Sequence, residues 1–397
     1  MIITFISNYI NHHQIPFSNA LYEKLGDAYC FIQTMPMEEE RVAMGWGIDM
    51  QSLPYVRCLY EEEYECRKKI AESDVVLAGW TGREDILEDR LQSGKLVIRI
   101  SERLYREGQW KAVSPRGLLA KYKEHIRYRN GNVYLLCAGA YTASDFGLIG
   151  AYPGKMFRWG YFPETRHYTR EALETMKKRE PGEPLQIVWA GRFIPLKHPE
   201  YAIKLAGRLQ EEGYAFRIHM LGDGELLPAS RQQAEMTHVS ENIVFHGYQE
   251  PAKVRQVMEK CHIHLFTSNY LEGWGAVVNE GMNSGCVEVV NAQVGAAPYL
   301  IEPGVNGLVY PDDSYEEMEK LVLDLFEHWE ERRQMGLAAY QTIVDEWNAE
   351  HAAAELMRFI GCLAKGKIVP ADSGPMSPAP VIAPGKMYRA MMEGGLK

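Results

Sequence analysis

Two glutamates eight residues apart, Glu272 and Glu280, stand in the segment with the clearest chemical meaning. It reads SNYLEGWGAVVNEGMNSG over residues 268–285, after an apolar stretch typical of a buried strand. Its glycines lead into a helical pattern. The backbone N–H groups of Gly273, Trp274 and Gly275 are therefore expected at a helix start, where N–H groups and the helix dipole bind phosphate oxygens. If the stretch is mainly helical, the two carboxylates lie up to about 12 Å apart.

That separation resembles the distance from a sugar ring to a ribose across a diphosphate. A carboxylate accepts two hydrogen bonds from a vicinal diol. Glu272 would then contact hexose hydroxyls and Glu280 ribose hydroxyls. The alternative is a polar loop followed by a solvated helix face.

A second segment, GRFIPLKH over residues 191–198, also follows a strand pattern and precedes a helix. Arg192 and Lys197 place two cations on one loop. Their predicted role is to neutralise a leaving diphosphate. The alternative is that both are ordinary surface cations.

Two shorter segments follow other strand patterns. Residues 221–225, LGDGE, indicate a tight turn. At residues 244–248 a strand ends at a glycine before Tyr248, where backbone groups could hydrogen-bond a base. The cluster of Cys261, His262 and His264 is interpreted as core and rim residues of a strand, and Asp312-Asp313 as a helix N-cap. We therefore expect no metal and no cofactor.

Strand and helix patterns alternate along most of the chain, which predicts an α/β protein with parallel sheets. Residues 161–184 are polar and contain three prolines and a glycine, which marks a domain boundary. The predicted domains are residues 1–165, residues 166–346, a crossover helix at 347–365 and a Pro/Gly-rich tail at 366–397. The twelve predicted strands are 2–7, 29–34, 56–60, 75–79, 96–101, 132–139, 186–192, 215–221, 242–247, 262–267, 287–291 and 307–310.

Composition excludes several classes of protein. The 397 residues carry a net charge of −10, which argues against sequence-independent nucleic-acid binding. Seven cysteines without paired spacing indicate no disulfide framework and favour a cytoplasmic location. No apolar stretch is long enough to span a bilayer, and the short apolar start is interpreted as a strand and not a signal peptide.

Together these segments resemble glycosyltransferase family 4 of the GT-B fold, most clearly over residues 186–363. The Glu-x7-Glu spacing and the Gly-Arg…Lys loop carry the resemblance. It implies two Rossmann-like domains facing across a cleft, with the C-terminal helix crossing back to the first domain. It further implies that Arg192 and Lys197 bind the donor diphosphate and that Glu272 contacts the donor sugar, these three forming the catalytic set. By the same resemblance Glu280 binds the ribose, the backbone of residues 273–275 holds sugar and phosphate, and Tyr248 flanks the base.

The first domain departs from the family pattern. Where many members carry a glycine-rich first loop, this chain has NYINHH over residues 8–13, and Ser101-Glu102-Arg103 replaces the expected histidine region. The candidates for the acceptor side are Glu102, His12 and His13; each is otherwise an ordinary loop residue. The basic stretch 121–129 fits a solvated helix face. The alternative is contact with an anionic lipid surface or a lipid-diphosphate acceptor, and so a peripheral place on the inner face of the membrane.

The predicted function is that of a retaining glycosyltransferase. It would move a sugar from a nucleotide-diphosphate sugar to a hydroxyl of a sugar or lipid-linked acceptor, in cell-surface polysaccharide or glycoconjugate synthesis, without a metal. Retention is implied by the resemblance alone. Two alternatives stay open: a GT-B nucleotide-sugar epimerase and a non-catalytic nucleotide-sugar-binding subunit. A dinucleotide oxidoreductase is disfavoured because no Gly-x-Gly-x-x-Gly follows the first strand.

Overall fold

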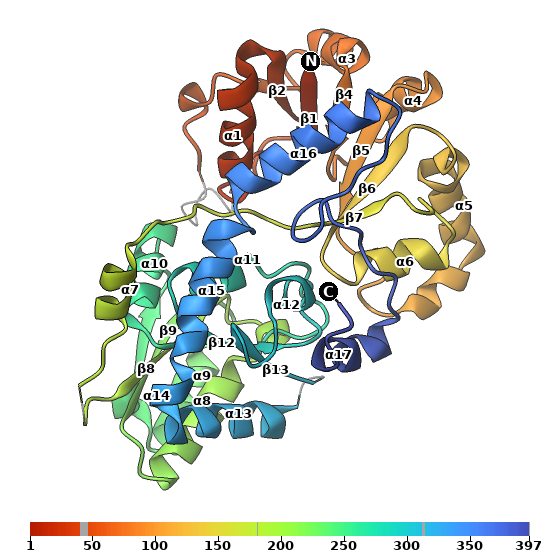
Figure 1. The fold of residues 1–397 in the computed structure, drawn as a ribbon. Coiled ribbons are helices and arrows are strands. Elements are labelled where there is room, and N and C mark those ends of the chain that lie inside the picture. Colours follow the sequence, from red (N-terminus) through yellow and green to blue (C-terminus); the bar gives the residue numbers. More distant parts are fainter. Residues whose placement is uncertain (40–46, 181, 312–313, 397) are drawn as a thin grey trace. The chain divides into compact units, whose positions relative to one another are not determined.

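Strands buried on both faces form two parallel sheets, as expected when short apolar strands alternate with helices. The computed structural model describes residues 1–39, 47–180, 182–311 and 314–396 (Figure 1). The chain divides into two units. The first comprises Met1–Glu164 and Asn348–Ala383, and the second comprises Thr165–Trp347 and Pro384–Lys397.

The first unit contains a seven-stranded sheet in the order β3-β2-β1-β4-β5-β6-β7, and every pairing in it is parallel. The chain reverses its direction of strand addition between β1 and β4. The strands are β1 (Ile3–Ser7), β2 (Tyr29–Gln33), β3 (Val56–Cys58), β4 (Val75–Ala78), β5 (Leu96–Ser101), β6 (Val133–Ala138) and β7 (Met156–Trp159).

Helices cover both faces of this sheet. Apolar side chains of α3, α4 and α6 form one cluster with Ile6, Ile32 and Val76. The other face carries α1 and α16, where Phe17 packs on Phe5 and Phe359 packs on strands β6 and β7. The helices of this unit are α1 (Ile15–Leu25), α3 (Glu63–Glu72), α4 (Asp85–Gln92), α5 (Pro115–Glu124), α6 (Thr142–Leu148) and α16 (Ala349–Leu363).

Helix α16 confirms the prediction that the C-terminal helix returns to the first domain. Its N-cap, Asn348, accepts a hydrogen bond from the backbone N–H of His351 at 2.7 Å. The helix then lies beside α1 (Figure 1). Ala352, Leu356 and Phe359 are fully buried, so the apolar stripe read from the sequence is the packed face.

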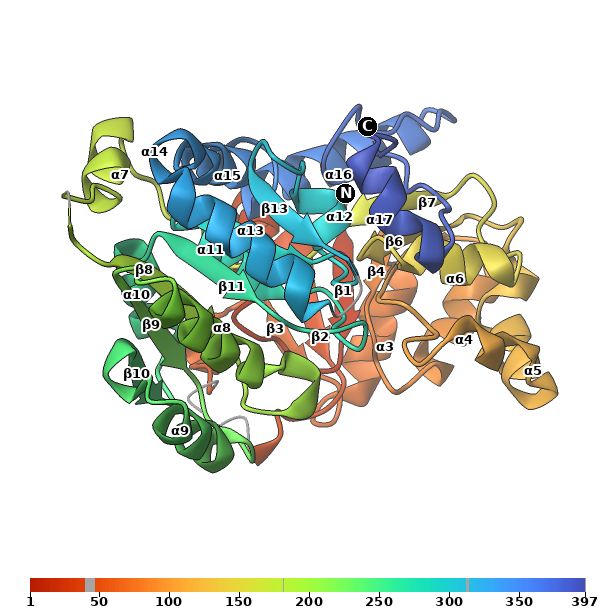
Figure 2. The same ribbon diagram turned by 90° about the horizontal axis from the view of Figure 1, so that it is seen from below.

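The second unit contains a six-stranded parallel sheet in the order β10-β9-β8-β11-β12-β13, which reverses between β8 and β11. Helices α8, α9 and α13 cover one face and α10, α11 and α15 the other (Figure 2). The strands are β8 (Leu185–Ala190), β9 (Phe216–Leu221), β10 (Ile243–Gly247), β11 (Ile263–Phe266), β12 (Val287–Asn291) and β13 (Gly307–Tyr310). The helices are α7 (Arg170–Met176), α8 (Pro199–Glu211), α9 (Leu227–Met236), α10 (Pro251–Lys260), α11 (Ala276–Asn283), α12 (Ala297–Leu300), α13 (Tyr315–Glu327), α14 (Trp329–Arg332), α15 (Gln334–Asp345) and α17 (Pro384–Met392).

All twelve predicted strands are present. Within the described residues the structure adds one strand, and it adds a helix to the tail, where no helix was predicted. The extra strand is β7, whose outer edge is bonded to the tail: the N–H of Arg158 donates to the carbonyl of Ser377 at 2.7 Å. The extra helix is α17 in the Pro/Gly-rich tail, which contacts α12 within the second unit. The predicted N-cap at Asp312-Asp313 lies outside the described residues; the N-cap of α13 is Ser314.

Candidate functional site

Two loops meet at the point where the second sheet reverses. Strands β8 and β11 are neighbours, so the loops that follow them lie side by side at the carboxyl edge, where open α/β sheets bind ligands. The first loop carries Lys197 and the second carries Glu272. Their ammonium and carboxylate form an ion pair, and the side chains are only 14% and 16% exposed. The structure therefore brings together two predicted site residues that are 75 positions apart.

Hydrogen bonds between the two loops hold Lys197 in place. The backbone N–H of Asn269 donates to the carbonyl of Leu196 at 2.9 Å. The hydroxyl of Thr267 donates to the carbonyl of Lys197 at 2.5 Å and accepts from the indole N–H of Trp189 at 2.8 Å. These bonds join the loop after β8 to the end of β11, so they fix the backbone of Lys197, and Glu272 holds its ammonium.

Arg192 lies on the same loop with its side chain exposed. Within the described part of the chain it forms no ion pair, unlike Lys197. An exposed guanidinium at the carboxyl edge of a sheet is available to an anionic ligand.

Glycines let the loops after β8, β9 and β10 pack backbone against backbone. The N–H of Gly222 donates to the carbonyl of Gly247 at 2.9 Å, and the N–H of Gly191 donates to that of Leu221 at 3.0 Å. A Cβ on Gly222 would lie 1.9 Å from the carbonyl oxygen of Gly191, which no side chain tolerates. The turn predicted at residues 221–225 lies slightly later: the N–H of Leu227 donates to the carbonyl of Gly224 at 3.0 Å.

The segment between the two glutamates is helical only in its second part, so the condition for the helical spacing is met in part. Helix α11 begins at Ala276, and Glu272 lies in the turn before it. Gly275 caps the helix with φ +87°, and a Cβ there would lie 2.9 Å from a methyl group of Val294. Among the described residues, the amides of Gly273 and Gly275 donate no hydrogen bond, so both are available at the helix start.

The side chain of Trp274 points away from this surface into the core. It is 1% exposed, its indole N–H donates to Asn279 at 2.8 Å, and its ring packs near that of Trp347. Its backbone carbonyl accepts from the N–H of Ala296 at 2.9 Å. Glu280 is half-buried on α11, and Tyr248 is 40% exposed after β10.

A buried pair lies beneath α11. His264 on β11 and Glu288 on β12 are partners in register, and their closest N–O distance is 2.8 Å at 0% exposure. A Cβ on Gly281 would lie 2.1 Å from the Glu288 carboxylate, so the glycine lets the helix rest directly on the pair. The sequence pattern predicts His264 as a core residue, but it gives no indication that Glu288 is its partner.

In the first unit, Tyr161 connects the acceptor-side candidates. Its ring stacks on that of His13 at 6.2 Å between centroids, and its hydroxyl donates to Glu102 at 2.7 Å. Glu102 also pairs with Arg106. The ring of His12 lies 3.9 Å from that of His13. Burial, and then the neighbouring His12, hold the pKa of His13 well below its usual value, so His13 is neutral at pH 7.

The sequence reading missed Tyr161 and Trp80. Trp80 follows β4, beside the point where the first sheet reverses, and is 67% exposed. The sequence did contain a signal for Trp80, because it shows a tryptophan directly after a predicted strand. Tyr161 offered no such signal, because β7, which precedes it, was not predicted.

Comparison with known proteins points to one family. Residues 172–342 match the family described as glycosyl transferases group 1. This region of the chain is therefore similar to the group 1 glycosyltransferases. A putative colanic acid biosynthesis glycosyltransferase, WcaL of Salmonella typhimurium, is 23% identical over 208 residues, which are 51% of this chain and 50% of WcaL. The lipopolysaccharide 1,6-galactosyltransferase of Escherichia coli is 26% identical over 45% of this chain and 49% of that enzyme.

Solved structures share the fold of this chain. Anabaena Alr3699/HepE in complex with UDP superposes with a TM-score of 0.68 at 12% identity, over 91% of this chain and 100% of HepE. WaaG, a glycosyltransferase involved in lipopolysaccharide biosynthesis, superposes with a TM-score of 0.56 at 13% identity, over 90% and 99%. The chain spans about half the length of the curated relatives that it matches. In the part that the structure describes, no helix is both long enough and apolar enough to cross a bilayer.

Proposed function

We propose that this protein is a retaining glycosyltransferase that moves a sugar from a nucleotide-diphosphate sugar to an acceptor hydroxyl. The family match and the curated relatives, which act in colanic acid, lipopolysaccharide and amylovoran synthesis by their names, support a role in cell-surface polysaccharide or glycoconjugate synthesis. Retention of the anomeric configuration rests on the family.

The Lys197–Glu272 ion pair carries the proposal. It places a cation for phosphate and a carboxylate for sugar hydroxyls on adjoining loops at the reversal of the sheet. A carboxylate has about four acceptor sites, so Glu272 can hold Lys197 and still accept from a sugar hydroxyl. The amides of Gly273 and Gly275 and the guanidinium of Arg192 supply further positive potential for the diphosphate.

In the proposed reaction the bond between the anomeric carbon and the donor phosphate oxygen breaks. The acceptor oxygen then bonds to that carbon on the same face. The leaving phosphate takes the acceptor proton, so no separate base is needed. Removing one electrostatic donor to a developing oxyanion typically slows an enzyme by about 10²–10³-fold. We expect Arg192→Ala to lower kcat by this order.

The acceptor side belongs to the first unit in this proposal. Tyr161, Glu102 and His13 form a connected polar group, and Trp80 offers an exposed ring on which a sugar could stack. The acceptor would be a free or lipid-linked sugar.

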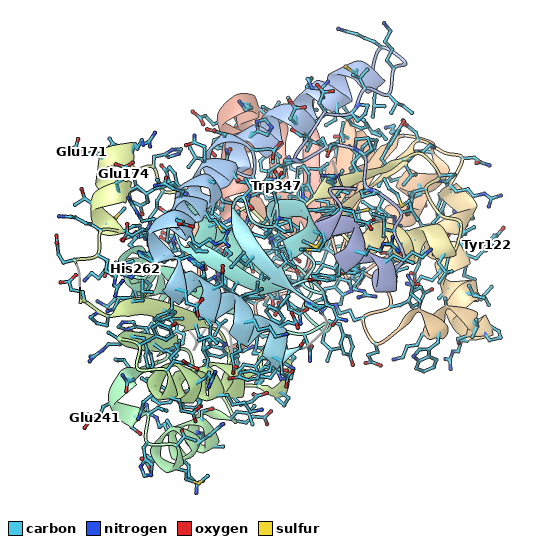
Figure 3. All side chains as sticks on the ribbon, turned by 60° about the horizontal axis from the view of Figure 1, so that its bottom comes forward. Tyr122, Glu171, Glu174, Glu241, His262 and Trp347 are labelled. Carbon is cyan, nitrogen blue, oxygen red and sulfur yellow. The ribbon has the colours of Figure 1, made fainter. Side chains whose placement is uncertain are left out.

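A nucleotide-sugar panel tests the donor assignment by thermal shift and by donor hydrolysis. UDP-glucose is the first candidate, because a HepE structure contains it. Glu280→Ala should weaken donor binding about 10-fold or more, the loss of a charged hydrogen bond. The matched control is Glu241→Ala (Figure 3), an exposed glutamate just before β10, whereas the loops of this site follow the strands.

Three results would contradict parts of the proposal. If no nucleotide sugar stabilises the wild type, the donor site is wrong. If Glu280→Ala binds donor as tightly as Glu241→Ala, the ribose assignment is wrong. Binding without turnover would indicate a non-catalytic subunit, and isomerisation of the donor sugar without acceptor would indicate an epimerase.

A further inference from the structure

Helix α5 of the first unit turns its apolar side chains outward. Leu119 is 56% exposed and Tyr122 53%, and α5 has no buried residue. Lys121 and Glu124 lie on the opposite side of the helix, half-buried and ion-paired at 2.7 Å. A surface helix of a globular domain normally shows the reverse arrangement. The orientation therefore needs an explanation outside the packing of the domain.

The exposed apolar surface extends into the 3-10 turn before α5, η4 (Gln109–Val113). Trp110 is 69% exposed and Val113 is 78% exposed. Arg116 and Lys123 stand on the same side of α5 as Leu119, because residues three and four apart share one helix face. We define the α5 surface by its exposed members: Trp110, Val113, Arg116, Leu119, Tyr122 and Lys123.

The charge of this region is opposite to that of the chain. Residues 109–129 contain six lysines and arginines and one glutamate, a net charge of +5, whereas the whole chain carries −10. Within the described residues, Arg116 and Lys123 form no ion pair, so their charges are not offset locally. An unpaired basic face beside aromatic and aliphatic side chains is complementary to an anionic, partly apolar partner.

Buried polar contacts fix the surface to the body of the first unit. Asp145 of α6 accepts hydrogen bonds from the N–H of Tyr105 and the amide of Gln109, both at 2.9 Å. After α5, His125 bonds the hydroxyl of Tyr152 at 2.8 Å in the core. Both ends of the segment are anchored, so the apolar side chains are exposed by a defined fold.

We propose that the α5 surface binds the surface of an anionic lipid bilayer. Tryptophan and tyrosine favour the membrane–water interface, and lysine and arginine are attracted to anionic headgroups. Leu119 and Val113 would enter the boundary with the acyl chains, a role that a nucleic-acid surface does not offer. Tyr122 lies at the outer edge of the first unit, on the side away from its sheet (Figure 3). The proposal does not depend on the proposed transferase activity, because binding to lipid needs no donor.

Vesicle flotation with the full chain tests this proposal. Wild-type protein should float with vesicles of phosphatidylcholine and phosphatidylglycerol, and not with phosphatidylcholine alone. High salt should weaken the binding. Tyr122→Ser/Lys123→Ser should weaken binding to anionic vesicles at least about 5-fold, because one lysine or arginine near an anionic surface contributes about that factor to the affinity. The matched control is Tyr64→Ser/Lys68→Ser, an exposed aromatic and lysine on α3 among glutamates, which should bind like the wild type.

A second variant, Trp110→Ser/Leu119→Ser, keeps every charge and should also weaken binding, because apolar insertion is lost. All these side chains are exposed, so thermal melts should match the wild type. The proposal is wrong if wild-type protein does not float with anionic vesicles, or if both surface variants float as it does. It is also wrong if the variants only convert a dimer into a monomer, since the surface would then join two copies of this chain.

Discussion

The Lys197–Glu272 ion pair should stabilise the second unit even without a donor, and this can be separated from its role in binding. We consider Lys197→Met, Glu272→Gln and the double variant. Lys197→Met leaves the Glu272 carboxylate without its cation in a place where only 16% of it is exposed. Glu272→Gln leaves the ammonium in the same position. The double variant removes both charges.

The burial of the two side chains sets the expected size of the effect. Breaking a fully buried pair costs about 3–5 kcal/mol, and an exposed pair contributes about 0–1 kcal/mol. With roughly 15% exposure on each side, we expect each single variant to lose about 2 kcal/mol of unfolding free energy. The double variant should lose about 1 kcal/mol or less, because no charge is left unpaired. The coupling between the two positions is then about 3 kcal/mol.

Urea unfolding of the four proteins, followed by tryptophan fluorescence, measures this coupling. The matched control is Arg170–Glu174 on α7, an ion pair at 2.8 Å whose side chains are 82% and 43% exposed (Figure 3). Its cycle should show no measurable coupling. Lys197→Met, Glu272→Gln and the double variant should all bind the donor more weakly. The double variant regains stability, but it still lacks the two charged groups proposed to contact the donor. Additive losses at Lys197 and Glu272 would refute the reasoning.

Three further predictions follow from other contacts. Burial lowers the folded-state pKa of His262 to about 4, so the unfolded chain binds the proton first. Stability should fall as pH drops from about 6.5 to 4, and His262 should account for up to about 3 kcal/mol of that loss. A pH series of urea midpoints should be shallower in His262→Gln but not flat, because burial also lowers the pKa of His219 to about 4. Gly222→Ala places a Cβ against the carbonyl oxygen of Gly191 and should lower the free energy of unfolding by at least about 3 kcal/mol. The control Gly207→Ala has open space around the added Cβ, so its thermal midpoint should be unchanged or raised. Tyr161→Phe removes the hydroxyl bonded to Glu102 and should lower kcat/KM for the acceptor about 10-fold; an equal loss in donor affinity would contradict an acceptor-side role.

The sheets were predictable because their signal is local. Each of the twelve predicted strands is a short apolar run, and such a run is recognised without knowledge of its neighbours. Strand β7 was missed because it lies between Gly154 and Gly160, close to the boundary that contains prolines, and glycine and proline mark loops. Helix α17 was missed because prolines and glycines surround it, although its own stretch carries Met387 and Met391 on one buried face.

The donor-side residues were also predictable, because each loop directly follows a strand. Strand neighbours in a parallel sheet place successive loops at one edge, so Lys197 and Glu272 could be expected together once β8 and β11 were paired. The residue at which helix α11 begins between the two glutamates could not be predicted. A glycine with φ +87° delays the helix until residue 276, and the sequence pattern does not distinguish this from an earlier start.

Contacts between distant side chains explain what the motifs did not reveal. Glu102 was a candidate only by its position after β5, and Tyr161, which bonds it, lies 59 residues further along the chain. His13 joins the same group from the end of β1 through ring stacking. None of the three belongs to a motif, yet all follow strands that end at one edge of one sheet. The first unit lacks the expected sequence motifs. Its candidate polar residues are therefore found from the residues that follow each strand and from the contacts between their side chains. Those contacts lead to Tyr161, a residue that neither periodicity nor resemblance had identified.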